Sequence, residues 1–363
     1  MHRLQTFFLM TILVGIFAEC LDAEPLRMVE PTDGAEVWLM KPDWRETVRQ
    51  YAEAEKDADG IGKVSFQAYP EPIVFRWKGG QSPFRLNITQ LVNNKQVKTI
   101  LSKAGEATVW NLFAGMAYRW ELQDANGAVV TGQFHTAQTP RLIALPDRGS
   151  TPVNVRDLGG WRTADGHWVR QGMVYRGSEL ASMPFLENLP SASAENKQFL
   201  LEGLGIRTDL DLRYEEQVAG RTCSDLSPKV QWLHYAVNAY EPLTSERNAL
   251  FREALRVFAN PSNYPIYVHC SGGADRTGEI CFLLEALLGV ADEELFTDYE
   301  LTSLARLPRP RAIPYFQEWL GRIAAFSPEP GLPYQRQAEN YLQAIGITTE
   351  EIATIRKLLL EER

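Results

Sequence analysis

The sequence predicts an all-β sandwich domain followed by an α/β domain whose central sheet is flanked by helices. Short runs of alternating apolar residues, separated by turn residues, extend from about residue 30 to 138, a pattern typical of antiparallel sandwiches. A proline-containing stretch without periodicity, 139–152, is the predicted linker. From 153 to 363, apolar strand-like runs alternate with helical runs, as in α/β domains. A chain of 363 residues is long enough for both domains.

The N-terminus has the layout of an export signal, which we expect to span residues 1–23. Arg3 supplies a positive charge, and FFLMTILVGIFA forms an apolar core that is too short to cross a membrane. Cleavage after Cys20 or Ala23 is compatible with the sequence, but Glu19 stands where a lipoprotein signal needs a small residue. We therefore expect an exported, periplasmic or extracellular protein with no lipid anchor and no integral membrane span.

Charge and cysteine content narrow the classes of function. The formal net charge of −9 does not attract nucleic acid or anionic lipid, so neither is an expected partner. Removal of the signal leaves Cys223, Cys270 and Cys281, too few for a disulfide framework. The histidines show no metal-site spacing, and we expect no metal and no cofactor.

The sandwich is predicted for residues 24–138. YRWELQDANGAVVTGQFHT contains two alternating runs joined by Asn126-Gly127, a strong hairpin signal. The charged segment at 43–60 interrupts the strands and is predicted to be helical. The run from LFAGMAYRW to GQFHT resembles the last two strands of a fibronectin type III-like domain. We expect this domain to dock or position an unknown partner.

The second domain begins at 153, and its elements alternate in type. Strands are predicted at 205–212, 230–237 and 266–270, and helices near 214–220, at 245–259, from 276 onward and in the C-terminal part.

HCSGGADRTG, residues 269–278, joins one of these strands to a helix. IYVHC is an apolar, β-rich run bounded by Pro265, and after Gly278 apolar residues recur at helical spacing until Gly289. The helix is therefore expected to begin at about Arg276. The first N–H groups of a helix have no internal partner and carry partial positive charge, so such a loop binds anions.

The loop has the composition of a phosphate cradle. Gly272 and Gly273 allow successive amides to converge on one point, and Arg276 adds a planar fork for two phosphate oxygens. The predicted phosphate-binding residues are Ser271, Gly272, Gly273, Ala274, Asp275 and Arg276.

Cys270 lies at the mouth of this cradle. A thiol near a helix N-terminus and an arginine has a lowered pKa, so it is present as a thiolate. A thiolate that faces a bound phosphate is a nucleophile directed at phosphorus. Thr277 is placed to hydrogen-bond the sulfur and to stabilise it as the leaving group of a second step.

The motif H-C-x-x-G-x-x-R-T-G resembles the loop of cysteine-based protein tyrosine phosphatases, and more narrowly that of the bacterial tyrosine phosphatase-like family. NVRDLGGWRTADGHWVRQGMVYRGSEL (154–180), LGIRTDLDLRYEEQ (204–217) and TDYELTS (297–303) resemble further segments of that family. The resemblance implies a phosphatase fold, a covalent cysteinyl-phosphate intermediate and no metal. Ala274 stands where the family usually has a lysine that would serve multiply phosphorylated substrates. A monoester such as phosphotyrosine is therefore favoured.

The general acid has two main candidates. The resemblance makes Asp275 a candidate, although it could instead bond loop amides. Asp211 ends a predicted strand, where ligand crevices form in α/β sheets; it could be the acid or could orient Arg213. Asp209 and Glu241 are weaker candidates. The sequence leaves the choice between Asp275 and Asp211 open.

The sequence predicts structural roles for three residues, one next to Cys270 and two in the segment 154–180. We expect His269 to fix the loop by hydrogen bonding rather than to act as a base. Arg156 and Asp157 belong to the first family-like segment, where we expect a structural turn held by Asp157, Gly159 and Gly160; shaping of the pocket wall is the alternative role.

The preferred hypothesis is a cysteine-dependent phosphomonoester hydrolase that acts on phosphotyrosine-type substrates, either a phosphorylated protein or a small phosphomonoester. A phosphatase of phosphoinositides or inositol phosphates is the alternative and would need extra basic groups around the pocket. An inactive phosphoprotein-binding module is the alternative from another class.

Overall fold

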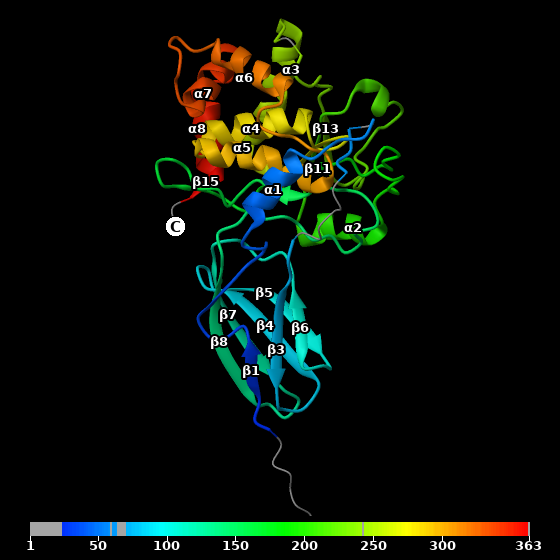
Figure 1. Ribbon diagram of the computed structural model, residues 1–363, viewed down its shortest axis with the longest axis vertical. Coiled ribbons are helices and arrows are strands. Elements are labelled where there is room, and N and C mark those ends of the chain that lie inside the picture. The colour runs from blue at the N-terminus through cyan, green and yellow to red at the C-terminus, as the bar shows by residue number, and fades with distance from the viewer. Residues whose placement is uncertain (1–23, 59, 64–69, 242, 362–363) are drawn as a thin grey trace, which may run out of the picture.

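The computed structural model describes residues 24–58, 60–63, 70–241 and 243–361. Two bodies are stacked end to end, a β sandwich and an α/β body (Figure 1). The predicted signal peptide and its cleavage sites lie outside the described residues. Among the described helices, none is both long and apolar enough to cross a membrane.

The sandwich consists of two sheets. The smaller sheet is antiparallel and has the order β1 (Arg27–Glu30), β3 (Ile73–Lys78), β6 (Glu106–Val109). The larger sheet has the order β2 (Ala35–Val37), β8 (Val129–Thr136), β7 (Ala117–Gln123), β4 (Phe84–Gln90), β5 (Lys95–Ser102). β2 pairs with β8 in parallel, and the other pairs are antiparallel.

Alternation along the strands decides which side chains enter the sandwich core. Ile73, Phe75 and Trp77 of β3 are all buried, and the ring of Phe75 packs edge-on against Phe134 of β8. The predicted hairpin is confirmed: the Asp124 carboxylate accepts the amides of two turn residues between β7 and β8. The fibronectin type III resemblance stays a prediction.

The α/β body is built on a five-stranded sheet, with β14 in the middle. Its order is β13 (Gln231–His234), β12 (Thr208–Asp211), β14 (Ile266–Cys270), β11 (Val174–Ser178), β9 (Arg156–Asp157). The first four strands are parallel and β9 is antiparallel. Every residue of β14 is buried, as is typical of the central strand of a parallel sheet that is covered on both faces.

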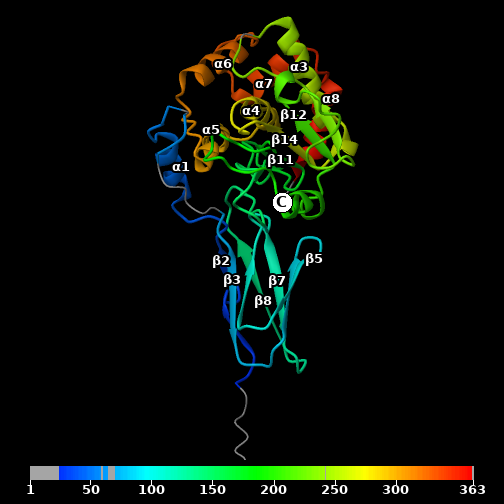
Figure 2. The ribbon, with the colours of Figure 1, turned by 90° about the vertical axis from the view of Figure 1, so that its right-hand side faces the viewer.

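Helices cover both faces of this sheet (Figures 1 and 2). The larger layer contains α3 (Ser245–Arg256), α4 (Arg276–Leu288), α5 (Asp292–Leu301), α6 (Pro314–Ala324), α7 (Tyr334–Ala344) and α8 (Thr349–Leu359). α4 is buried along its whole length and ends at Gly289, which adopts the left-handed conformation of a C-cap. The opposite face carries α2 (Ala194–Gln198) and a π-helical turn, Phe199–Gly203. A short ladder of β10 (Trp168–Val169) and β15 (Leu360–Glu361) joins the C-terminus to this body.

Two predicted helices differ from those observed. The helix near 214–220 is wrong: only a 3₁₀ turn, Glu215–Gln217, forms there. The segment is polar, and the Gln217 side chain bonds the Tyr214 amide, which closes a single turn instead of continuing it. The helix at 245–259 is α3 followed by the 3₁₀ turn Val257–Ala259.

The charged segment between β2 and β3 contains α1 (Trp44–Ala52), which ends well before residue 60. We call α1 and the described residues after it, 53–58 and 60–63, the insert. Although the strands around it belong to the sandwich, α1 packs on the α/β body next to α5 (Figure 2). Trp44, Val48 and Tyr51 are buried in the same apolar core as α4 and α5.

Buried polar contacts also fix the junction between the two bodies. Gln171 of the α/β body exchanges two hydrogen bonds of 2.9 Å with the backbone of Ala114 in the sandwich. Arg141 of the connecting segment lies 2.6 Å from Asp157, and both side chains are buried. Removing either ionic partner would leave a buried charge without compensation, so this junction resists separation.

Candidate active site

Cys270 ends β14, and α4 begins at Arg276, so the loop between them connects the central strand to the N-terminus of the central helix. The side chain of Cys270 is buried. Burial by itself raises the pKa of this thiol, but the charge of Arg276 and the hydroxyl and amide of Thr277 outweigh it, and the net pKa is lowered. The Thr277 hydroxyl is buried and has no oxygen or nitrogen partner among the described residues, which leaves it available to the sulfur.

Side chains of the first family-like segment, residues 154–180, donate hydrogen bonds to the carbonyls of the phosphate-binding loop. Asn154 Nδ2 donates to the carbonyls of Gly272 and Gly273 at 3.3 and 3.0 Å, and Arg176 Nη2 donates to the carbonyl of Gly273 at 3.1 Å. In a planar trans peptide the next N–H points opposite to the carbonyl. The amides of Gly273 and Ala274 therefore point away from this support, as a phosphate-binding nest requires.

Gly273 meets a strict steric requirement. Its φ is +65°, and a Cβ there would lie 2.2 Å from the carbonyl oxygen of Gly177 on β11. Only glycine fits both conditions without displacing backbone. The tight turn of the loop therefore depends on this residue.

Arg276 is oriented by several contacts, among them a hydrogen bond of 3.4 Å from its Nη1 to the carbonyl of Leu212. Its Nη1 donates to Gln217 Oε1 at 2.9 Å, its Nη2 donates to Ser271 Oγ at 3.1 Å, and the guanidinium lies 4.2 Å from the ring centroid of Tyr214. Gln217 in turn donates to Ser271 at 2.9 Å. The fork is thus held beside Cys270 before any substrate oxygen arrives, which lowers the entropy cost of binding a phosphate.

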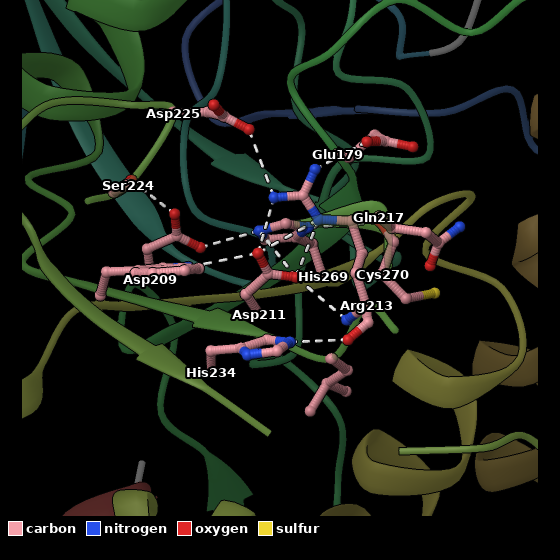
Figure 3. A network of polar contacts seen from close by, with 12 residues as sticks. Glu179, Asp209, Asp211, Arg213, Gln217, Ser224, Asp225, His234, His269 and Cys270 are labelled. Atoms are coloured by element: carbon pink, nitrogen blue, oxygen red, sulfur yellow. Dashed lines mark hydrogen bonds and ion pairs between the residues drawn. The ribbon is translucent and has the colours of Figure 1, made fainter. Parts of the chain in front are cut away.

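A network of charged side chains supports the strand that carries Cys270 (Figure 3). His269 Nε2 lies 2.8 Å from Asp209 Oδ1 and 4.0 Å from Asp211 Oδ1. Burial lowers the pKa of His269, but these two carboxylates raise it more, to about 9. His269 is therefore a buried cation that holds the end of β14, in agreement with its expected structural role.

Asp211 is engaged on both oxygens. Arg213 donates to it through Nε at 2.9 Å and through Nη2 at 2.6 Å, and Trp232 Nε1 adds a bond of 3.2 Å. Burial by itself would raise the pKa of Asp211. The charge of His269 and the charge and hydrogen bonds of Arg213 outweigh burial, and the net pKa lies well below its usual range. Asp211 is not among the residues that line the pocket above Cys270, and side-chain donors occupy both of its oxygens, so it has no access to a leaving oxygen there. Of the two predicted roles of Asp211, the geometry supports orienting Arg213 and argues against that of the acid.

Asp275 occupies a different position. It immediately precedes α4 and lines the pocket together with Cys270 and Arg276. Arg309 binds both of its oxygens, at 2.7 and 2.8 Å, and Tyr240 donates to it at 3.2 Å. Burial raises the pKa of Tyr240 well above its usual value, so the phenol keeps its proton.

The weaker acid candidates do not reach the pocket. Asp209 pairs with His269 and accepts a bond from Ser224 behind the sheet end. Glu241 is exposed and accepts a bond of 2.9 Å from Asn238. Neither residue is among those that line the pocket.

Asp157 holds a turn, since its carboxylate accepts the Gly159 amide at 2.9 Å. Arg156 instead reaches α5, and neither residue lines the pocket. Arg156 donates to Asp298 of α5 at 2.9 Å, and Arg176 donates to the same carboxylate at 2.6 Å. All three side chains are buried. This triad ties the first family-like segment, through Arg176, to the carbonyl of Gly273 and to the TDYELTS helix.

The pocket above Cys270 has a volume of about 420 Å³. The loop residues Ser271, Gly272, Ala274, Asp275 and Arg276 line it. The other lining residues were not predicted; they are Lys56, Gly60, Phe185, Tyr214, Ala239, Leu307, Arg309 and Tyr315.

Two of the unpredicted residues left a signal in the sequence. Tyr214 directly follows the D-L-R element, and Arg309 lies in the basic, proline-rich run after TDYELTS. Lys56 left none, because only tertiary packing brings the insert to the pocket. In the part of the chain that the structure describes, no group of three or more His, Cys, Asp or Glu side chains could hold a metal ion.

Comparison with known proteins places these observations in a family context. Residues 149–323 match a family model described as the tyrosine phosphatase family. The chain is 29% identical over 175 residues to a candidate tyrosine-protein phosphatase, H16_A0669 of Cupriavidus necator, covering 41% of this chain and 60% of that protein. It is 34% identical over 88 residues to a candidate tyrosine-protein phosphatase, OCA1 of Mycosarcoma maydis, covering 23% of this chain and 54% of that protein. The chain thus spans less than two thirds of the length of either relative.

Solved structures are also similar to this chain, and one of them serves as an example. The core catalytic domain of the PP-IP phosphatase SIW14 from S. cerevisiae, in complex with citrate, aligns with 22% identity and a TM-score of 0.29, covering 40% of this chain and 78% of that one. The family match supports the resemblance to cysteine-based tyrosine phosphatases.

Proposed function

We propose that this protein is a phosphomonoester hydrolase that acts through a cysteinyl-phosphate intermediate on Cys270. One observation carries the proposal: a thiol with a lowered pKa lies in a single pocket with Arg276 and with the carboxyl group of Asp275. The match to the tyrosine phosphatase family supports it.

In the first proposed step, the Cys270 thiolate attacks phosphorus, an S–P bond forms and the P–O bond to the leaving group breaks. Asp275 gives its proton to the leaving oxygen, and Arg276 and the loop amides bind the equatorial oxygens. In the second step, water attacks phosphorus and transfers a proton to Asp275, and the S–P bond breaks. Thr277 then stabilises the departing thiolate. The products are an alcohol or phenol and inorganic phosphate.

Arg309 must release one oxygen of Asp275 for this proton transfer. It holds both oxygens in a bidentate fork, so it positions the acid rather than transferring a proton itself. A substrate phosphate that competes for the Arg309 guanidinium would free Asp275 Oδ1 or Oδ2 as it binds.

A phosphotyrosine-type substrate is favoured by the pocket walls. Phe185, Tyr214 and Tyr315 line the pocket, and Phe185 is an exposed aromatic residue. Aromatic side chains of this kind pack against a phenyl ring in edge-on or offset geometry. The alternative, an inositol phosphate, is favoured by Lys56 and Arg309, two cations of the pocket beyond Arg276.

The test compares p-nitrophenyl phosphate, a phosphotyrosine peptide and inositol hexakisphosphate, each with EDTA present. We expect release of phosphate from the first two, and loss of activity in Cys270→Ser. Cys223→Ser is the matched control, since Cys223 is a half-buried loop thiol outside the pocket. Activity that persists in Cys270→Ser, or that requires a metal, would overturn the mechanism. Binding without turnover would support the inactive phosphoprotein-binding module instead.

We also propose export to the periplasm or the medium. The sandwich domain is proposed to position the insert and to dock an unknown partner. Fractionation of cells that express the full chain, followed by N-terminal sequencing of the mature protein, tests the export proposal. A product that keeps residues 1–23 would contradict it.

A further inference from the structure

The pocket receives one of its cations from the sandwich half of the chain. We propose that Lys56, carried by the insert, binds a second anionic group of the substrate, a carboxylate or phosphate next to the phosphate that Cys270 attacks. This inference rests on the proposed function, because it assigns the specificity of the same pocket.

The insert is firmly attached to the α/β body. The apolar side of α1 is buried against α5, and on its polar side Arg45 forms an ion pair of 2.8 Å with Glu294. Arg49 approaches Glu293 at 3.3 Å. Exposed pairs of this kind add little energy, so the buried residues of α1 supply most of the attachment.

The loop that follows α1 is also held in place. Lys56 forms a β-bridge with Gly62, and the Gly62 amide donates to the carbonyl of Arg306 at 2.9 Å. Ile61 is buried in a small apolar cluster that also contains Leu307 and Ala274 of the phosphate-binding loop. The backbone at Lys56 is therefore positioned from both sides, by α1 before it and by Ile61 after it.

The same cluster explains why the loop itself supplies no cation on this side. Ala274 is buried beneath Ile61 and Leu307. A charged side chain at 274 would have to enter this apolar cluster, which is costly without a partner. The positive charge at this wall of the pocket comes instead from Lys56, whose side chain is exposed and lines the pocket.

Lys56 is placed to bind an anion from outside the chain. No hydrogen bond or ion pair joins its side chain to another described residue, whereas Arg309 is already committed to Asp275. The pKa of Lys56 is lowered, first by burial and then by the charge of Arg309, while Asp275 raises it. Lys56 and Arg309 lie near a single carboxylate, that of Asp275, so these three charges leave a net positive charge, which a second substrate anion would neutralise.

Two classes of substrate carry an anionic group a short distance from the phosphate that Cys270 attacks. One is a peptide with an acidic side chain adjacent to phosphotyrosine. The other is a small polyol with a second phosphate. The experiment therefore uses two substrate pairs: a phosphotyrosine peptide with Glu or with Gln beside the phosphotyrosine, and an inositol bisphosphate against a monophosphate.

The full chain is assayed as wild type, Lys56→Met, Lys56→Glu and Lys63→Met. Lys63 lies on the same insert, is exposed and does not line the pocket, so its substitution is the matched control. We expect the wild type and Lys63→Met to prefer the more anionic member of at least one pair by about fivefold in kcat/KM at low salt. Lys56→Met should abolish this preference. Lys56→Glu should reverse it, which a merely structural role of Lys56 could not produce.

The outcomes separate this inference from the proposed function. A preference confined to one pair identifies the source of the anion. No preference in the wild type, or equal losses in the Lys56→Met and Lys63→Met variants, overturns the inference. The same pairs are titrated by calorimetry against Cys270→Ser with Lys56 intact and against Cys270→Ser that also carries Lys56→Met. Absence of turnover with a Lys56-dependent difference in affinity would refute the proposed function and leave the Lys56 site standing.

Discussion

Asparagine at position 275 keeps the shape of the Asp275 side chain and removes the proton that we propose it gives to the leaving oxygen. A positioned general acid contributes about 10²- to 10⁴-fold to rate. We therefore expect kcat/KM of Asp275→Asn to fall at least about 100-fold on an alkyl phosphate, which leaves poorly. On p-nitrophenyl phosphate, whose phenolate leaves without help, the fall should be about tenfold or less.

The structure also predicts what this substitution does to stability. The Asp275 and Arg309 side chains are 30% and 15% exposed, so Arg309 stays mostly shielded from water when its ionic partner is lost. The free energy of unfolding should fall by about 1–3 kcal/mol. Initial rates on the two substrates and urea unfolding measure both effects on the same protein preparation.

Asp211→Asn is the matched comparison. The Asp211 side chain is fully buried and Arg213 is 1% exposed, and breaking such a pair costs about 3–5 kcal/mol. Any loss of activity should be the same factor on both substrates, because Asp211 does not reach the pocket. If Asp211→Asn showed the leaving-group dependence and Asp275→Asn did not, the assignment of the acid would be refuted.

Three further outcomes follow from the site. Cys270 should be alkylated at neutral pH much faster than Cys281, whose pKa burial raises to about 12, and inorganic phosphate should protect it; equal rates would contradict the lowered pKa. The pKa of His269 rises from 6.5 to about 9 on folding, so protonated His269 stabilises the folded chain. This contribution to the free energy of unfolding is complete below about pH 6.5 and is lost as the pH rises through 9. It amounts to about 3 kcal/mol, and urea unfolding of wild type and His269→Gln across this range should converge at high pH. Gly273→Ala should abolish phosphate release, because its Cβ would lie 2.2 Å from the Gly177 carbonyl oxygen; circular dichroism checks that the fold persists.

Local signals predicted the strand-loop-helix unit correctly. The β-rich run of β14, the glycines of the loop and the helical spacing of apolar residues after Arg276 are all contiguous in sequence. The segment near 214–220 failed because a polar stretch without periodicity does not distinguish a helix from a single turn. There the side-chain bond of Gln217 decided the outcome.

The sequence by itself determined the chemistry of the loop, since the cysteine, the glycines and the arginine lie within one short segment whose backbone geometry is local. It could not decide between Asp211 and Asp275, because both are aspartates that lie one or two positions before an arginine, each at the edge of a predicted strand or helix. Only the folded chain shows that Arg213 and His269 surround Asp211 behind the sheet end, whereas Asp275 lines the pocket. Nor could the sequence reveal Lys56, because its place in the pocket depends on burial of α1 against a helix from the other half of the chain. Contacts of that range follow from packing, which no local pattern encodes.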